Sequence, residues 1–133
     1  MARIIDKIAW IRLESGRILG TRSRGKDRYY LPGGKREAGE SDHDTLVREI
    51  DEELSVAIVR ETAVLFGSFE AAAHGHTDGT LVRMTCYTAD YRGTLAPSHE
   101  IEEIAWLTYA DRPRVSPVDQ LIFDHLQERG LWG

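Results

Sequence analysis

The sequence is short of the features that mark several classes of protein. It contains a single cysteine, Cys86, among 133 residues, so no disulfide can form within the chain. This excludes a secreted scaffold held together by disulfides and favours a reducing compartment. No run of about 18 apolar residues is present, so no segment is expected to cross a membrane. Charged residues near the start also argue against a signal peptide, and we expect a cytoplasmic location.

The chain also lacks an excess of positive charge. Its 17 Lys and Arg residues are outnumbered by 22 Asp and Glu residues, which gives a formal net charge of -5. Binding to a nucleic-acid polymer requires a dominant basic face, so a DNA- or RNA-binding protein is not expected. A basic block between Arg17 and Arg36 precedes an acidic block between Glu37 and Glu61. Such blocks can arise by chance, but they also suit a site that holds metal cations beside an anionic substrate.

No repeat, low-complexity tract or linker interrupts the sequence, so we expect one domain over residues 1–133. Hydrophobic alternation predicts strands over residues 4–14, 17–22, 58–70, 80–91 and 101–108. Residues 23–40 are rich in glycine and charge and are expected to form a long loop. Two helices are predicted over about 42–54 and 117–129, each begun by a serine with an aspartate three residues later. This order indicates an α+β fold, an α-β-α sandwich whose mixed β-sheet is flanked by helices.

The predicted helix 42–54 gathers three carboxylates on one face. With Glu49 as the reference, Glu52 lies at about −60° and Glu53 at about +40° around the helix axis. Carboxylates at this spacing repel one another, whereas Mg²⁺ is commonly held by one or two carboxylates together with substrate phosphates. The alternative interpretation is a solvated acidic face, which charge runs commonly form.

The residues before this helix favour the metal site. Gly33 and Gly34 belong to a glycine-rich loop, where the backbone can approach a ligand closely. A loop of this kind between basic residues and an acidic helix is typical of a site for phosphate and metal. Arg48 is the only Arg or Lys in the helix and could orient a neighbouring carboxylate.

The spacing of these residues resembles the Nudix box, Gly-x5-Glu-x7-Arg-Glu-U-x-Glu-Glu-x-Gly-U, in which U is apolar. The matching positions are Gly34, Glu40, Arg48, Glu49, Ile50, Glu52, Glu53 and Val56. One position departs from the pattern, because Ser55 replaces a glycine that usually ends the helix in a left-handed conformation. A serine there costs about 1 kcal/mol if its φ is positive, but the replacement removes no carboxylate.

The resemblance implies a Nudix fold and a hydrolase that depends on Mg²⁺, with Mn²⁺ as a substitute. Glu52 and Glu53 would be metal ligands, Glu49 would be either a ligand or the general base, and the carbonyl of Gly33 would complete the coordination. Arg48 would hold Glu49 in place.

Many members of the family place a further acid before a strand that bears a tryptophan. Glu100 is the residue that we expect in this role, with Glu103 as its competitor and a solvated strand edge as the alternative.

The resemblance also implies residues that bind the substrate. Arg22, Lys35 and Arg36 could contact phosphate, although each is equally consistent with an ordinary surface residue. Asp119 lies where some MutT-like relatives place an amide or acid that reads the base. It is also the third residue after Ser116, and we favour the interpretation that it completes a helix capping box.

The implied reaction is attack of water on a phosphorus of a diphosphate linkage in a small-molecule nucleotide. The positions where ADP-ribose hydrolases carry a proline and dinucleoside-polyphosphate hydrolases carry a tyrosine are Ala72 and Ala73 here. This favours a MutT-like nucleoside triphosphate pyrophosphohydrolase that releases a nucleoside monophosphate and pyrophosphate. Hydrolysis of ADP-ribose, another nucleotide sugar or a dinucleoside polyphosphate is the alternative.

Two further alternatives concern a non-catalytic role and metal other than magnesium. A nucleotide-binding sensor module would be expected to have lost one of the three glutamates, and none is lost. His74 and His76 lie two residues apart, but a zinc site needs further ligands that the sequence does not place nearby. A homodimer is compatible with a small enzyme, although nothing in the sequence identifies an interface.

Overall fold

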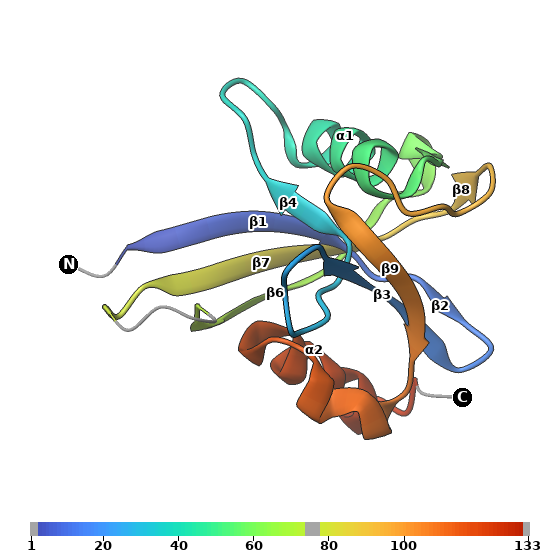
Figure 1. Cartoon of the computed structure of the whole chain (residues 1–133). Coiled ribbons are helices and arrows are strands. Elements are labelled where there is room, and N and C mark those ends of the chain that lie inside the picture. The colour runs from blue at the N-terminus through green and yellow to red at the C-terminus, as the bar shows by residue number, and fades with distance from the viewer. Residues whose placement is uncertain (1–2, 74–77, 132–133) are drawn as a thin grey trace.

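The computed structural model describes residues 3–73 and 78–131. Figure 1 shows the helices α1 and α2 on opposite sides of the strands. The elements in chain order are β1 (Ile4–Trp10), β2 (Leu13–Glu14), β3 (Arg17–Ser23), β4 (Gly33–Lys35), α1 (Asp42–Leu54), β5 (Ala57–Ile58), the 3₁₀ helix η1 (Arg60–Thr62), β6 (Val64–Ala72), β7 (Leu81–Thr88), β8 (Tyr91–Arg92), β9 (Ile101–Leu107), the 3₁₀ helix η2 (Tyr109–Arg114) and α2 (Pro117–Glu128).

The strands form a mixed β structure. The largest sheet has the order β4-β1-β7-β6, in which β1 and β7 are parallel and the other neighbours are antiparallel. A second sheet, β2-β3-β9, is antiparallel, and β5 pairs with β8. The predicted α+β sandwich with a mixed sheet between two helices is therefore confirmed (Figure 1).

Strand β1 contributes to a core on each of its faces. Ile8 and Trp10 are fully buried in a cluster that contains the apolar residues of α1. Ala9 and Ile11 belong to the other cluster, which contains the apolar residues of α2. Because side chains alternate across a strand, one segment can anchor both helices. The acidic face of α1 is left free by this packing.

Helix α1 begins and ends where the sequence predicts. Its N-cap Ser41 accepts a hydrogen bond from the Asp44 amide, and the Asp44 carboxylate accepts one from the Ser41 amide, each at 3.1 Å. These two bonds are the predicted capping box. At the other end, Ser55 adopts the left-handed conformation with φ 60° and ψ 30°. Serine therefore occupies the conformation that favours glycine.

The predicted capping box of α2 is wrong. Ser116 is the N-cap residue, but its side chain makes no capping hydrogen bond. Instead its hydroxyl donates to Asp119 Oδ2 at 2.6 Å, and the Asp119 side chain is fully buried. The buried Asp119 carboxylate needs a hydrogen-bond donor from the protein, because water cannot supply one there.

Two further predictions need correction. The expected loop 23–40 contains strand β4, in which Gly33 pairs with Ala9 of β1. A Cβ on Gly33, whose φ is +148°, would lie 2.0 Å from the Ile8 carbonyl oxygen, so the approach of the two strands requires glycine. The expected strand 58–70 is divided by η1. In the described ranges, no helix is long and apolar enough to cross a membrane.

Candidate functional site

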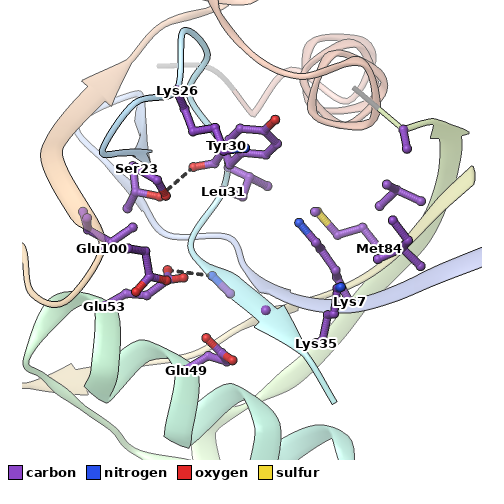
Figure 2. A pocket seen from close by; sticks show the side chains of 17 residues that line it. Lys7, Ser23, Lys26, Tyr30, Leu31, Lys35, Glu49, Glu53, Met84 and Glu100 are labelled. Carbon is purple, nitrogen blue, oxygen red and sulfur yellow. Dashed lines mark hydrogen bonds between the residues drawn. The ribbon is translucent and has the colours of Figure 1, made fainter. Parts of the chain in front are cut away.

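A pocket of about 510 Å³ lies between α1 and the strands β1, β4 and β7. Figure 2 shows Glu49, Glu53 and Glu100 gathered on one side of it and Lys7 and Met84 across from them. We call these the glutamate end and the deep end. The deep end is also lined by Ile5, Tyr30, Leu31, Ala73 and Val82.

Glu53 is the most deeply buried acid of the glutamate end, with 6% of the residue exposed. Its Oε1 accepts a hydrogen bond from the Gly33 amide at 3.1 Å, which ties α1 to β4. Burial, with smaller contributions from the charges of Glu49 and Glu100, raises the pKa of Glu53 to about 8 despite this bond. A cation among these three carboxylates would remove the repulsion.

Glu49 lies directly over Gly34. A Cβ at Gly34 would come within 2.3 Å of the Glu49 carboxyl carbon, so a side chain there would displace the acid. Burial raises the pKa of Glu49, while the neighbouring Arg48 guanidinium opposes the shift. The glycine of the box is thus explained by the carboxylate that it accommodates.

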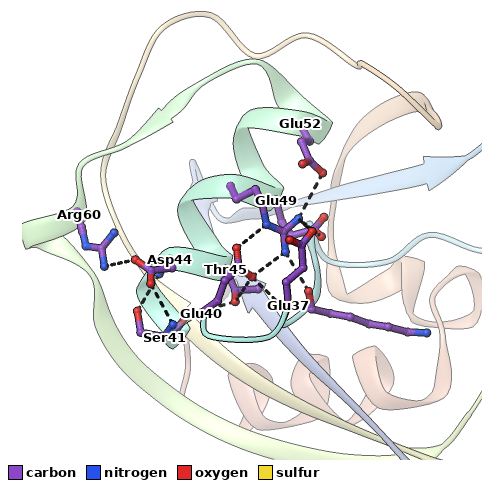
Figure 3. Close-up of polar contacts among 10 residues, drawn as sticks. Glu37, Glu40, Ser41, Asp44, Thr45, Glu49, Glu52 and Arg60 are labelled. Atoms are coloured by element: carbon purple, nitrogen blue, oxygen red, sulfur yellow. Dashed lines mark hydrogen bonds and ion pairs between the residues drawn. The ribbon is translucent and has the colours of Figure 1, made fainter.

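Arg48 connects the loop before α1 to the glutamate face. Its Nε donates to Glu40 Oε2 at 2.6 Å and its Nη2 donates to Glu40 Oε1 at 2.9 Å, a paired arrangement with fixed geometry. Its Nη1 donates to Glu49 Oε1 at 2.9 Å. These bonds from Arg48 lower the pKa of Glu40 to about 2. Figure 3 shows Glu37, Glu40, Glu49 and Glu52 grouped around this cluster of contacts.

The remaining acids differ in their access to the pocket. Glu52 does not line it, and its side chain, 44% exposed, lies 3.5 Å from Arg48 Nη1. Glu100 lines the pocket and faces Glu53 (Figure 2). Glu103 is held by Arg22, whose Nε lies 3.1 Å from Glu103 Oε1. Of the two candidates for the additional acid, the structure brings Glu100 to the glutamate end.

The three predicted phosphate contacts are placed differently. Lys35 lines the pocket. Arg22 does not, because its guanidinium pairs with Glu103 and, at 2.6 Å, with Glu102. Arg36 also lies outside the lining and pairs with Asp42 and, at 3.4 Å, with Asp6.

Asp119 lies behind the deep end, at the start of α2. Burial raises the pKa of its carboxyl to about 6, against the opposing effects of the Ser116 hydroxyl and the positive charge of Lys7. Its Oδ1 has no hydrogen-bond partner within residues 3–73 and 78–131. A small cavity beside the pocket is lined by Lys7, Tyr30 and Met84 together with Ser116 and Val118 of the same turn as Asp119. Asp119 itself lines neither cavity, so this acceptor lies directly behind the cavity wall.

Sequence reasoning missed Lys7 and Tyr30. Lys7 lines both cavities. The signal was present, because Lys7 interrupts the otherwise apolar face formed by Ile5 and Ala9 of β1 and by Ile11, which directly follows the strand. Tyr30 carries no comparable pattern in the sequence. His74 and His76 lie outside the described residues.

The carboxylates of the glutamate end are oxygen donors of the kind that hard divalent cations bind. Within the described ranges, no three His, Cys, Asp or Glu side chains converge as a ready-made metal cage. Mg²⁺ retains several waters and is commonly bound by one or two carboxylates and substrate phosphates. The buried Glu53 and the Glu49 carboxylate seated over Gly34 could supply such carboxylates.

Comparison with known proteins agrees with this geometry. The family model described as NUDIX domain matches residues 5–126. The solution structure of the E. coli ORF135 protein is 25% identical, with a TM-score of 0.69, and the match covers 96% of this chain and 91% of that chain. A MutT Nudix hydrolase from Burkholderia pseudomallei is 22% identical, with a TM-score of 0.76 and coverage of 92% and 97%. No curated protein matches the sequence.

The chain belongs to the Nudix family. It is a hydrolase that acts on phosphoric anhydride bonds, and the family acts on small-molecule nucleotide substrates. Its structural neighbours include proteins named MutT from several bacteria, and the likeness to them is a likeness of fold.

Proposed function

We propose that this enzyme is a Mg²⁺-dependent, MutT-like nucleoside triphosphate pyrophosphohydrolase that releases a nucleoside monophosphate and pyrophosphate. The observation that supports it is a single pocket in which a cluster of glutamates continues into a deep end lined by Tyr30 and Met84. A nucleoside triphosphate has two parts that correspond to these ends: an anionic phosphate chain and a base whose flat ring has apolar faces.

At the glutamate end, Glu53 and Glu49 would hold Mg²⁺ with the Gly33 carbonyl, and Glu100 would add a carboxylate from the opposite wall. Mg²⁺ (or Mn²⁺ in its place) supplies charge for the phosphate oxygens and lowers the pKa of a bound water. Glu49 is the acid that we assign as the general base, because Arg48 orients it and it faces the pocket. Glu52 would become a further metal ligand if its carboxylate gave up its contact with the Arg48 guanidinium.

Lys35 is the basic residue that we assign to the phosphates, since it already lines the pocket. Arg22 and Arg36 would have to release two carboxylates each to contact the substrate. We therefore expect their contribution to phosphate binding to be smaller than that of Lys35.

At the deep end, Asp119 is the residue that we assign to the base. Its Oδ1 is buried and without a hydrogen-bond partner within residues 3–73 and 78–131, and such an oxygen is stabilised by an N–H group of a ligand. The apolar side chains of Val82 and Met84 provide a surface against which a ring can pack.

The test is turnover of a panel of nucleoside triphosphates, ADP-ribose and dinucleoside polyphosphates, with Mg²⁺ and with EDTA. Product analysis distinguishes pyrophosphate from phosphate. Glu53→Gln is expected to lower kcat by at least about 100-fold, because it removes a buried charge at the metal. Glu61→Gln, the same change at an exposed position of η1, is the matched control and is expected to behave as wild type.

Each arm of this experiment can contradict part of the proposal. Faster turnover of ADP-ribose than of any triphosphate would show that the substrate is a nucleotide sugar and not a nucleoside triphosphate. Full activity of Glu53→Gln, or turnover that is unchanged by EDTA, would refute the metal site. Release of phosphate in place of pyrophosphate would refute the assigned cleavage position.

A further inference from the structure

Lys7 is the one charged side chain of β1 that points into the deep end. Its Nζ lies 5.4 Å from the centroid of the Tyr30 ring, and Figure 2 shows it directed away from the glutamates toward Tyr30. An ammonium group placed among Tyr30, Val82 and Met84 has lost much of its water. This burial lowers the pKa of Lys7.

No hydrogen bond or ion pair within the described residues holds the Lys7 ammonium group. The acids whose charges reach it, Asp119 first and then Glu53 and Glu49, act from a distance. Lys7 is half-buried, and a lysine drawn into a pocket without a hydrogen-bonding or ionic partner needs an explanation. Its three N–H donors are available to an acceptor that enters the pocket.

The neighbours of Lys7 separate two kinds of acceptor. Lys35 lies opposite Lys7 in the β1–β4 register and lines the pocket as well. Lys35 belongs to the strand that carries Gly33 and Gly34, beside Glu49 and Glu53, which is where phosphates would lie. Lys7 also lines the small cavity next to Ser116 and Val118, and Asp119 is buried behind this cavity, in the same helical turn.

The donor of Lys7 and the acceptor of Asp119 thus lie at the same end of the pocket. The pairing edge of a nucleobase presents ring acceptors and N–H donors side by side, and proteins read that edge by hydrogen bonds while apolar and aromatic side chains cover the ring faces. A base packed against Tyr30 and Met84 can meet both groups at once. A phosphate would use the donor and be repelled by the acid.

We propose that Lys7 is a specificity-determining residue that donates a hydrogen bond to an acceptor on the nucleobase, beside the N–H group accepted by Asp119. This inference rests on the proposed function, because it assumes a nucleotide substrate. It assigns different roles to the two lysines of the pocket: Lys7 contacts the base and Lys35 contacts the phosphates.

The separate roles of Lys7 and Lys35 can be tested by ligand binding alone, in the absence of metal and of catalysis. Binding of free nucleosides, nucleoside monophosphates and ribose 5-phosphate is measured by NMR titration in EDTA. Lys7→Met is expected to weaken binding of the best nucleoside by about ten- to a hundredfold, the effect of losing a hydrogen bond from a charged donor, and to leave ribose 5-phosphate unchanged. Lys35→Met is expected to do the reverse. Arg17→Met, at an exposed position, controls for the change in net charge.

A conservative variant and thermal unfolding separate recognition from structure. Lys7→Gln retains an N–H donor and is expected to recover part of the lost nucleoside affinity, whereas Lys7→Met does not. Both variants are expected to unfold no lower than wild type, because no hydrogen bond or ion pair within the described residues is lost and the buried charge is removed.

Three results would overturn the inference. Equal weakening of ribose 5-phosphate and nucleoside by Lys7→Met would make Lys7 a phosphate ligand. Unchanged nucleoside binding in a folded Lys7→Met variant would show that Lys7 does not contact the base. Failure of the wild type to bind any nucleoside in EDTA would overturn the inference, and the proposed function would be overturned with it only if triphosphate turnover with Mg²⁺ were absent as well. Normal triphosphate turnover with unchanged Lys7→Met binding would overturn the inference alone.

Discussion

The helices α1 and α2 begin with the same pattern, Ser-x-x-Asp, and the structure uses it in opposite ways. In α1 the aspartate, Asp44, completes a capping box with the exposed Ser41, and its side chain is 42% exposed. In α2 the aspartate, Asp119, is fully buried, and the Ser116 hydroxyl donates to it. The difference lies in what surrounds each helix start.

This comparison separates an acid that caps a helix from a buried acid that we propose as a ligand contact. At a surface, a carboxylate is best placed on the free amides of the first helical turn. Behind a cavity, the same carboxylate can be kept in a partly satisfied state that a ligand completes. Helix α1 supplies its pocket acids later, at Glu49 and Glu53, whereas Asp119 of α2 is buried behind the cavities and lines neither of them.

Substituting the aspartates at the two helix starts is expected to have its largest effect on substrate binding. Asp119→Ala is expected to lower kcat/KM by about ten- to a hundredfold, mainly through KM, because it removes an acceptor for the base. Asp44→Ala, the equivalent change in α1, is expected to leave kcat/KM unchanged. Steady-state kinetics with the best triphosphate measures both. A fall in kcat at constant KM for Asp119→Ala would contradict the assignment of this residue to the base.

The second prediction concerns pH. The pKa of Glu53 is raised to about 8 from 4.5, so the metal-free folded protein holds one proton more than the unfolded chain between these values. Stability of the metal-free protein should therefore fall as pH rises from about 4.5 to about 8. Since Mg²⁺ must displace this proton, its apparent affinity should rise by up to about tenfold per pH unit below 8 and then level off.

Calorimetric titration with Mg²⁺ between about pH 6 and pH 9, in buffers of different ionisation enthalpy, measures this proton release directly. Asp119 sharpens the test, because burial raises its pKa only to about 6 and it lies at the other end of the pocket. Asp119→Asn should leave the slope near pH 7.5 in place. A slope that survives in Glu53→Gln would show that another group carries the proton.

The parts of the molecule that follow from local sequence were predictable. Helix α1, its cap at Ser41 and the grouping of Glu49 and Glu53 depend on residues a few positions apart, where helical spacing decides the geometry. Strand β4 was not predictable in this way, because its three residues become a strand only by pairing with β1. Its glycines resemble those of a loop.

The deep end of the pocket depends on packing between distant segments. Lys7, Tyr30 and Asp119 come from three parts of the chain, and no local pattern indicates that they meet. Arg22 and Arg36 show the same limit, since the sequence left phosphate contact and a surface role equally open, and both residues pair with acids of other elements. Spacing motifs therefore predicted the glutamate end better than the deep end.

The two helix starts can also be compared through stability. Ser41→Ala should lower the free energy of unfolding by about 1 kcal/mol, the usual cost of losing an N-cap side chain, without changing kcat/KM. Ser116→Ala removes no cap but takes the hydroxyl donor from Asp119, so it should raise the pKa of Asp119 further and weaken substrate binding. Denaturant unfolding and a KM profile against pH measure the two effects. Loss of stability without any change in KM for Ser116→Ala would show that this hydroxyl is only structural.

The helix ends carry the smallest predicted effect, and they differ as clearly as the starts. Helix α1 ends with Ser55 at φ 60°, whereas α2 is followed by Gly130 at φ 67°. A side chain in this conformation costs about 1 kcal/mol, so Ser55→Gly should raise Tm by about 3–5 °C and Gly130→Ser should lower it by a similar amount. A Cβ at Gly130 meets no atom within 4 Å, so strain alone is tested there. If Gly130→Ser lowers Tm and Ser55→Gly leaves it unchanged, the Ser55 side chain must offset its own strain, and the departure from the Nudix box would carry no cost in stability.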